Sequence, residues 1–307
     1  MKSDVNDDVE GGTGICVDEG HKPRPGSTLV VLVHPGRERA LLRLLASVAK
    51  SNHDAMYPVE VVVVTQNVSD LAGLVQSVKP ALKVPIRTSV FQDAETVPAL
   101  RNRALEMVAT QWMHSVDSDT QVPGNYFVEL TRCMSARASS TDVFQLGFMP
   151  APESSRWAGY EAMMDCWYTS WYISTAGVFG LNGMNFVARP DVLRVAGGFR
   201  ETMVSAEDIE LGYRLRAANV GIDYLPQVRI IHHYPENPNT ITRRKFWHGQ
   251  GFVSRRKSCP ALNKFRPSAS QIVFWLARRF VDPLFLWYYL VSTSAFILGM
   301  RSSRDHE

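Results

Sequence analysis

The sequence Gln111-Trp112-Met113-His114-Ser115-Val116-Asp117-Ser118-Asp119-Thr120 decides how the rest of the chain is interpreted. Its first half has the character of a strand end, and Pro123-Gly124 then breaks the pattern. Alternate side chains of an extended chain share a face, so Asp117 and Asp119 point the same way. Mg²⁺ characteristically binds one or two carboxylates together with phosphate oxygens of a substrate. The stretch therefore predicts a metal–diphosphate site, with a solvated acidic turn as the alternative.

Length, charge and cysteine spacing limit the possible classes of protein. The 307 residues suffice for one large α/β domain with appendages. Residues 237–281 contain ten Lys or Arg and no Asp or Glu, although the whole chain has a net charge of only +3. The four cysteines lack CxxC spacing, which argues against a zinc cluster or a disulfide framework and favours a reducing compartment. Residues 1–28 are acidic and Gly-rich, so we expect a disordered tail rather than a secretory signal.

The first half of the chain alternates between apolar runs and helical patterns. Predicted strands cover residues 29–33, 59–64, 86–91 and 111–115, and predicted helices cover residues 37–50, 71–78 and 98–109. This alternation predicts an α/β fold with a mostly parallel sheet and helices on both faces. Ligands of such sheets bind beyond the carboxyl ends of the strands, where Asp117 and Asp119 would lie.

The second half is less regular. Residues 157–172 are rich in aromatic side chains, which we interpret as core rather than as a ligand platform. A helical pattern follows Ser205-Ala-Glu-Asp208 and stops at Gly221, and residues 228–233 have the pattern of a strand that ends on two histidines. If both histidines belong to that strand, their rings face opposite sides, so at most one of them serves a site.

Five motifs, in this order along the chain, resemble the family-two glycosyltransferases with the GT-A fold. They are Leu100-Arg-Asn-Arg-Ala104, Asp117-Ser-Asp119, Gly183-Met-Asn-Phe-Val-Ala-Arg189, Gly197-Gly-Phe-Arg-Glu201 and Glu207-Asp-Ile-Glu-Leu-Gly-Tyr-Arg-Leu215. The resemblance spans about residues 29–252 and implies a Rossmann-like GT-A domain there. It also implies inverting, hexosyltransferase-like transfer from a nucleotide-sugar donor, a UDP-sugar above all, to a hydroxyl, with Mg²⁺ or Mn²⁺ as cofactor.

The resemblance assigns roles to particular residues. Asp117, Asp119 and His232 would hold the metal. The family often places a histidine near the metal or diphosphate at this strand end, and His232 is chosen over His233 because it shares a face with Val228 and Ile230. Asp208 would be the general base that takes the proton of the attacking hydroxyl, with Glu207 beside it. Read without the resemblance, Ser205-x-x-Asp208 is also a capping box, in which Asp208 only satisfies the start of a helix.

Donor contacts follow from the same resemblance. Pro35, Gln66, Arg101, Asp117 and Asn185 are the expected donor-binding residues. The family usually carries an Asp after its second strand that contacts uracil, whereas this chain has Thr65-Gln-Asn67, so the uridine is not fixed by the motif. An amide can still pair with a base edge as donor and acceptor.

The Gln-x-x-Arg-Trp motif of processive polysaccharide synthases is not present in the sequence; residues 243–251 are a loose echo of it. We therefore expect a single addition. The acceptor that we expect is a lipid-linked or surface glycan in polysaccharide biosynthesis.

The last part of the sequence, residues 253–307, combines basic and apolar stretches. Leu284 to Met300 gives 17 residues without a charge, which is at the lower limit for crossing a bilayer. A spanning helix, an interfacial helix and a buried core helix all fit this stretch. The neighbouring cations and Trp275, Trp287, Tyr288 and Tyr289 favour membrane contact, at the cytoplasmic face.

Other functions remain as alternatives. A catalytically inactive GT-A scaffold that binds a nucleotide sugar is consistent with the missing Asp after the second strand. A nucleotidyltransferase would need an early Gly-rich signature, for which His34-Pro-Gly-Arg37 is too short. The basic stretch lacks a recognisable nucleic-acid-binding module, so nucleic acid is not an expected partner.

Overall fold

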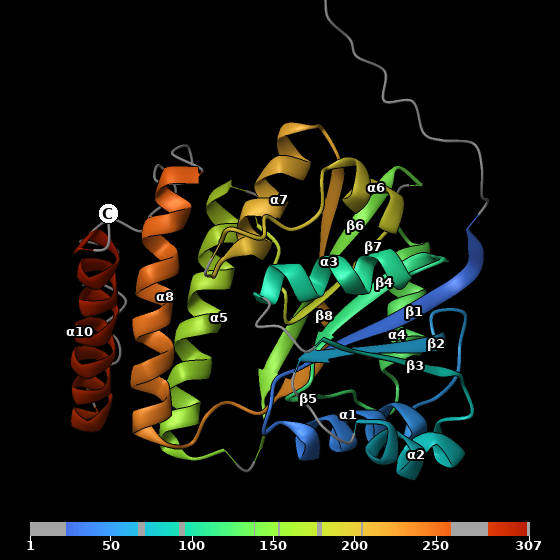
Figure 1. The fold of residues 1–307 in the computed structure, drawn as a ribbon, viewed down its shortest axis with the longest axis horizontal. Coiled ribbons are helices and arrows are strands. Elements are labelled where there is room, and N and C mark those ends of the chain that lie inside the picture. The colour runs from blue at the N-terminus through green and yellow to red at the C-terminus, as the bar shows by residue number, and fades with distance from the viewer. Residues whose placement is uncertain are drawn as a thin grey trace, which may run out of the picture.

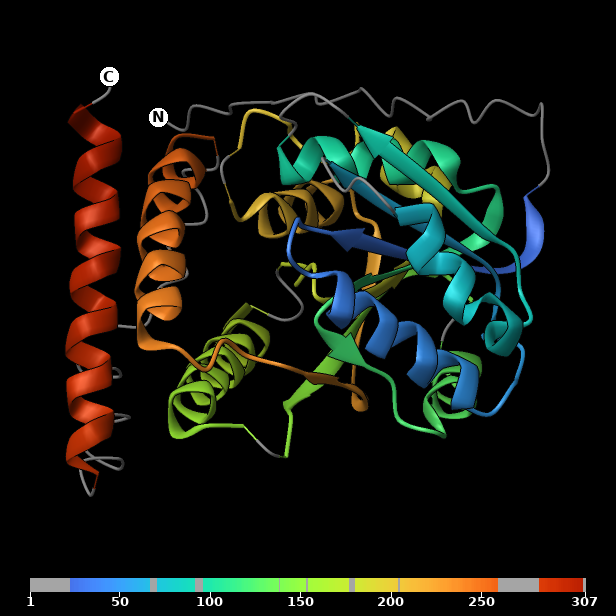
Figure 2. The same cartoon turned by 60° about the horizontal axis from the view of Figure 1, so that its bottom comes forward.

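The computed structural model describes residues 23–66, 71–91, 96–137, 139–152, 154–176, 180–203, 205–258 and 282–305. They form a mixed α/β fold in which helices surround a curled eight-stranded sheet (Figures 1 and 2). The strands follow the order β3-β2-β1-β4-β7-β6-β8-β5 across the sheet.

The first half of the sheet is parallel, as the sequence predicts. Its strands are β1 (Arg24–Val33), β2 (Pro58–Gln66), β3 (Ile86–Phe91) and β4 (Thr110–Asp117). The helices that connect them are α1 (Glu38–Lys50), α2 (Leu71–Leu82) and α3 (Val97–Met107). Strand β1 lies between β2 and β4, so most of its side chains are buried on both faces, which explains its continuous apolar run.

Helices cover both faces of the sheet, which confirms the predicted layering. One cluster of buried side chains packs α1, α2 and α4 (Tyr126–Ser135) on one face. A second cluster packs α3, α6 (Pro190–Val195) and α7 (Glu207–Ala217) on the other face.

The second half of the sheet is mixed rather than parallel. It adds β5 (Thr120–Gln121), β6 (Thr141–Pro150), β7 (Asn185–Ala188) and β8 (Gly221–His232). Strand β7 is antiparallel to β4 and β6, β8 is parallel to β6, and β5 is antiparallel to β8. The short antiparallel strand β7 therefore lies between β4 and β6, which share one direction, directly beside the acidic stretch.

Three helices stand together at one side of the sheet: α5 (Arg156–Ala176), α8 (Pro238–Ser258) and α10 (Pro283–Asp305). Helix α10 is outermost, with α8 between it and the body of the fold (Figures 1 and 2). Trp157 and Tyr160 of α5 are partly buried against α10, as the core interpretation predicts, whereas Tyr168 of the same segment is exposed.

Two boundaries differ from the sequence prediction. Strand β1 begins at Arg24, so residues 24–28 belong to the sheet and not to a tail; residues 1–22 lie outside the described residues. Strand β8 begins at Gly221, seven residues before the predicted start at residue 228, because this stretch pairs with β6. Residues 259–281, which contain part of the predicted membrane-associating segment, also lie outside the described residues.

Candidate active site and metal centre

The two acidic side chains of the Asp117-Ser-Asp119 stretch meet His232 where β4 ends. Strand β5 follows this stretch at once and pairs with the end of β8, with Thr120 opposite His232. This pairing places His232 Nε2 at 3.3 Å from Asp119 Oδ1. One ligand atom each from Asp117, Asp119 and His232 lies within 4.8 Å of the others. Short strand pairing thus brings His232 to two acidic residues that lie more than 100 positions before it in the chain.

The two carboxylates have different electrostatic surroundings. Burial raises the pKa of Asp117; the Arg101 charge opposes this rise, and the neighbouring Asp119 carboxylate adds to it. Burial also acts to raise the pKa of Asp119, but the hydrogen bond and charge of His232, with Arg37 and Arg244, hold it well below its usual value. A divalent cation would neutralise the repulsion between these carboxylates. The donor set of two carboxylates and an imidazole fits Mn²⁺ or Mg²⁺.

Two arginines that sequence reasoning missed lie near these carboxylates. Arg37, in the turn after β1, has its Nη1 at 3.2 Å from Asp119 Oδ2. The pKa of Arg244, on α8, is raised: burial opposes the increase, and the charges of Asp165, Glu161 and Asp119 outweigh it. Arg37 follows the carboxyl end of a predicted strand, which is a usable sequence signal, whereas α8 is placed by tertiary packing alone.

Arg101, a predicted donor-binding residue, is buried at the centre of the site. Its guanidinium lies 3.7 Å from Asp117 Oδ1 and 3.4 Å from Glu207 Oε1, and it stacks over the Phe199 ring at 5.4 Å. Gly183 lies directly against this guanidinium, and a Cβ at that position would overlap it. Arg101 therefore joins the motifs around residues 117, 183, 199 and 207 into one site.

Asn102, the next residue on α3, holds the Gly197–Glu201 motif through the backbone of Phe199. The Asn102 side chain accepts a hydrogen bond from the Phe199 N–H at 2.7 Å and donates one to the Phe199 carbonyl at 2.8 Å. Gly198, which precedes Phe199, has a φ of +64°, a conformation that favours glycine.

Asp208 is held by backbone donors at the start of α7. Its Oδ2 accepts from the Gly183 N–H at 2.6 Å, and its Oδ1 accepts from the Ile209 N–H at 2.8 Å. The residue before the helix is Ala206, with a φ of +64° and no side-chain cap. The capping-box alternative for Ser205 and Asp208 is therefore wrong, because the chain enters the helix one residue later than that motif requires.

Glu207 is buried beside Asp208. Burial raises the pKa of Glu207 to about 7; the Arg101 charge opposes the rise, while Asp208 adds to it. A carboxyl group with a pKa near neutrality can exchange a proton at physiological pH.

The remaining predicted donor residues divide into two groups. Pro35 is exposed in the turn after β1 and Gln66 ends β2, so both lie at the carboxyl edge of the sheet with Asp117. Asn185 is buried on β7 instead. Its Oδ1 accepts from Tyr126 Oη at 2.7 Å, and its Nδ2 donates to the Gly147 carbonyl at 2.9 Å. These contacts favour a structural role for Asn185, which the sequence motif did not indicate.

The two adjacent histidines at the end of β8 contact different residues. His232 faces Asp119, whereas His233 Nε2 lies 2.7 Å from Gln121 Oε1. The predicted choice of His232 as the residue beside the two acids agrees with this placement.

Comparisons with known proteins give matches to glycosyltransferases. The family model for "Glycosyl transferase family group 2" matches residues 112–302. A search of curated proteins gave no match.

Several solved structures are similar. The mannosyltransferase PcManGT from Pyrobaculum calidifontis, in complex with GDP-Man and Mn²⁺, has a TM-score of 0.64 and 13% identity, over 94% of this chain and 91% of that one. S. aureus TarS 1–349 in complex with UDP-GlcNAc has a TM-score of 0.52 and 13% identity, over 92% of each chain. GalNAc-T7 with UDP, GalNAc and Mn²⁺ has a TM-score of 0.54 and 14% identity, over 81% of this chain and 54% of that one. At these identities the likeness shows a shared fold.

Proposed function

The chain belongs to glycosyl transferase family group 2, and from this we propose that it moves a sugar from a nucleotide-sugar donor to an acceptor hydroxyl with inversion of the anomeric centre. The predicted GT-A fold is confirmed by the structural neighbours. The observation that carries the proposal is the convergence of Asp117, Asp119 and His232 at the edge of the sheet where the strands end.

We assign the metal site to Asp117, Asp119 and His232, with Mg²⁺ or Mn²⁺ as the ion. When bound, the ion neutralises charge that develops on the departing diphosphate and orients it. The neighbouring PcManGT and GalNAc-T7 structures contain Mn²⁺, and the unequal environments of the two carboxylates here fit a cation between them.

Donor recognition falls to the residues on the same edge. We assign Pro35 and Gln66 to the nucleoside, and Asp117 and Arg101 to the diphosphate and sugar. Because the Gln66 amide both donates and accepts, it can pair with a uracil edge. We propose a UDP-sugar donor; TarS and GalNAc-T7 were solved with UDP or UDP-GlcNAc, whereas PcManGT was solved with GDP-Man.

In the transfer step the acceptor oxygen attacks the anomeric carbon from the side opposite the diphosphate. The bond to the diphosphate breaks, and the Asp208 carboxylate takes the proton of the acceptor hydroxyl. The Gly183 and Ile209 N–H groups fix the orientation of Asp208 before the acceptor arrives. Glu207 is the second carboxyl group at this point and fixes Arg101 beside Asp117.

The acceptor we propose is a lipid-linked or surface glycan that receives one sugar per reaction in polysaccharide biosynthesis, at the cytoplasmic face of a membrane. Support comes from helix α10, in which Pro283–Ser302 is, by length and composition, long and apolar enough to cross a membrane. The sequence without a Gln-x-x-Arg-Trp motif supports single addition.

A second candidate is a catalytically inactive scaffold that binds a nucleotide sugar. One observation favours it: Thr65 and Gln66 end β2 where the family usually has an Asp that contacts the base. Thr65 is fully buried and its hydroxyl donates to the Val33 carbonyl at 2.6 Å, so Gln66 is left as the base-contacting side chain of the two.

Calorimetric titration tests the binding part of both candidates. UDP, GDP and their sugar conjugates are titrated into the full chain with Mn²⁺, with Mg²⁺ and with EDTA. We expect UDP to bind in the presence of either ion and to bind much more weakly in EDTA, and Asp119→Asn to weaken binding as EDTA does. Equal affinity with and without the ion would contradict the proposed site. Glu106→Gln is the control, because Glu106 is an exposed carboxylate on α3.

A further inference from the structure

We propose that α10 lies in the plane of a membrane, with its outer apolar face docked on an anionic lipid surface, and does not cross the bilayer. This deepens the membrane association proposed above and is independent of the transfer chemistry. It rests on the two faces of α10, on the charged helix packed along it and on the charges around it.

Helix α10 has two different faces. Phe285, Tyr288, Ser292, Ala295 and Gly299 are buried and recur every three or four residues, so they form one stripe. The large apolar side chains on the other side are exposed: Leu284, Trp287, Leu290, Ile297 and Leu298. Leu290 is 56% exposed and Leu298 is 55% exposed. A core helix would cover such side chains. The exposed Ser294 separates Leu290 from Ile297 on this face, but large exposed apolar side chains gathered on one side of a helix still mark an interaction surface.

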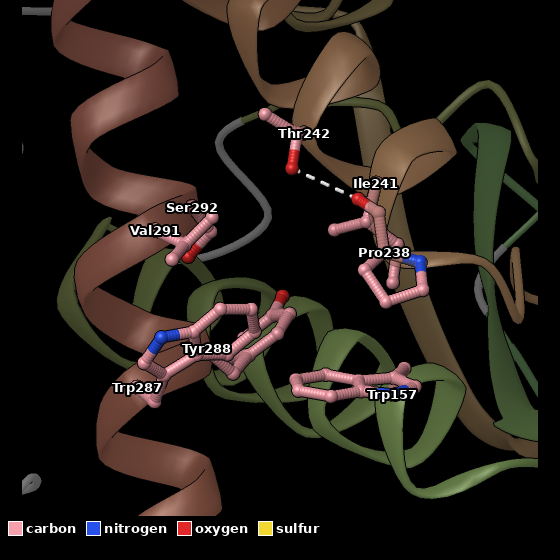
Figure 3. A pocket seen from close by; sticks show the side chains of 8 residues that line it. All are labelled: Trp157, Pro238, Ile241, Thr242, Trp287, Tyr288, Val291 and Ser292. Carbon is pink, nitrogen blue, oxygen red and sulfur yellow. Dashed lines mark hydrogen bonds between the residues drawn. The ribbon is translucent and has the colours of Figure 1, made fainter.

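The buried stripe packs against the catalytic domain. Figure 3 shows Tyr288 of α10 on the side that faces Trp157 of α5, and Ile241 and Thr242 of α8 line the same pocket. The Tyr288 hydroxyl donates to the Glu161 carboxylate of α5, which is fully buried. Lys245 of α8 pairs with the same carboxylate at 2.7 Å. This polar network fixes α10 to the two helices behind it.

Helices α8 and α10 run alongside each other at very close approach. A Cβ on Gly249 would overlap the Phe296 carbonyl, and a Cβ on Gly299 would overlap the Phe246 carbonyl. Phe252 and Phe296 also contact, with ring centroids 5.4 Å apart. If α10 crossed a bilayer, α8 would have to enter the hydrocarbon with it.

Helix α8 cannot enter hydrocarbon. Its exposed cations include Arg243 in the first half and Arg256 in the second half, whereas Arg244 and Lys245 face buried carboxylates of α5. A charged side chain at the bilayer centre is costly unless an opposite charge or water compensates it. The length and apolar composition of α10 are therefore those of a span, but its packing is that of a helix in the membrane plane.

Exposed cations on α8 and α10 favour anionic lipid as the occupant. Arg243 is exposed on α8 and stacks over the exposed Trp247 ring at 5.3 Å, and Arg256 and Arg301 are also exposed. Residues 237–281 contain no acidic residue in the sequence. A second copy docked on this face would bring two sets of cations together, whereas anionic headgroups neutralise them. Indole rings such as those of Trp247 and Trp287 suit the headgroup level.

Vesicle cosedimentation of the full chain tests the proposal. The probes are phosphatidylcholine vesicles with and without phosphatidylglycerol. We expect binding to the anionic vesicles, weaker binding to neutral ones, and release of the protein by alkaline carbonate. The double variant Leu290→Glu/Leu298→Glu should bind roughly tenfold or more weakly, because two apolar anchors are lost.

The control variant is Val128→Glu/Val195→Glu, which places the same charges at exposed valines of α4 and α6 and should bind as the wild type does. Melting temperature and UDP binding are measured on each variant, which separates a failed docking surface from a failed donor site. Retention after carbonate would show a spanning helix, and unchanged binding of the leucine variant would show another surface. A dimer abolished by the leucine variant, without vesicle binding, would identify a second copy as the occupant; each of these results overturns the proposal.

Discussion

The Gly183 N–H donates a hydrogen bond to Asp208, with 2.6 Å between the nitrogen and Oδ2. This bond links the loop before β7 to the first turn of α7, and the Ile209 N–H occupies the other carboxylate oxygen at 2.8 Å. Asp208 is therefore oriented by the backbone, so a substitution there changes its chemistry more than its position.

We predict that Asp208→Asn reduces sugar transfer by about 10²–10⁴-fold, because an amide cannot take the acceptor proton. One oxygen is replaced by an NH₂ group that faces a backbone N–H, so stability falls by about 1–2 kcal/mol as well. Transfer rates and urea unfolding measure these two effects, and UDP affinity reports on the donor site. Asp54→Asn is the matched control, because the exposed Asp54 also accepts from the N–H of the next residue, at 2.7 Å. Transfer within a few-fold of the wild type would move the base to Glu207.

Gly183→Ala should destabilise the protein, since its Cβ would overlap the Arg101 guanidinium. The expected loss is about 1–3 kcal/mol, with weaker UDP binding because Arg101 must move away from Asp117. Denaturant unfolding and calorimetry measure both quantities. Gly124→Ala is the control, because a Cβ there meets no atom within 4 Å. Equal stability of the two variants would show that the Arg101 guanidinium does not pack against Gly183.

Buried His114 makes stability depend on pH. Burial lowers the pKa of His114 to about 4 against a hydrogen bond with Asn185, whereas the unfolded chain titrates near 6.5. Because the unfolded state binds the proton first, stability is full above about pH 6.5 and is lost as pH falls toward 4, by about 3 kcal/mol. His114→Gln should remove this part of the pH dependence in denaturant unfolding from pH 4 to 7. The exposed His34→Gln serves as control, and an unaltered slope in His114→Gln would refute the assignment.

The sequence predicted the parallel half of the fold because its strands are buried on both faces. Such strands appear as continuous apolar runs, as in Leu29–Val33, and the helices between them have a clear period. The mixed half was not predictable in the same way. Strand β7 has four residues and β5 has two, so neither is long enough to show a pattern.

The candidate site was predictable to the extent that its residues stand at the ends of strands. Asp117, Asp119 and His232 were found in this way and come together. Arg244 was missed because α8 reaches the site only through its packing on α5 and α10. Asn185 was assigned to the donor from its motif, but its burial beside His114 and Tyr126 depends on the position of β7 in the sheet.

The most direct test of the central claim is release of the nucleoside diphosphate from a panel of nucleotide sugars by the full chain, with Mn²⁺ or Mg²⁺ present. Slow hydrolysis in water reports on the donor site without a known acceptor. We predict that a UDP-sugar is cleaved with either ion, that EDTA stops the reaction, and that Asp119→Asn nearly abolishes it while Glu106→Gln does not. Binding without cleavage of any donor would favour the inactive scaffold, and full turnover in excess EDTA would contradict the metal-dependent glycosyltransferase described here.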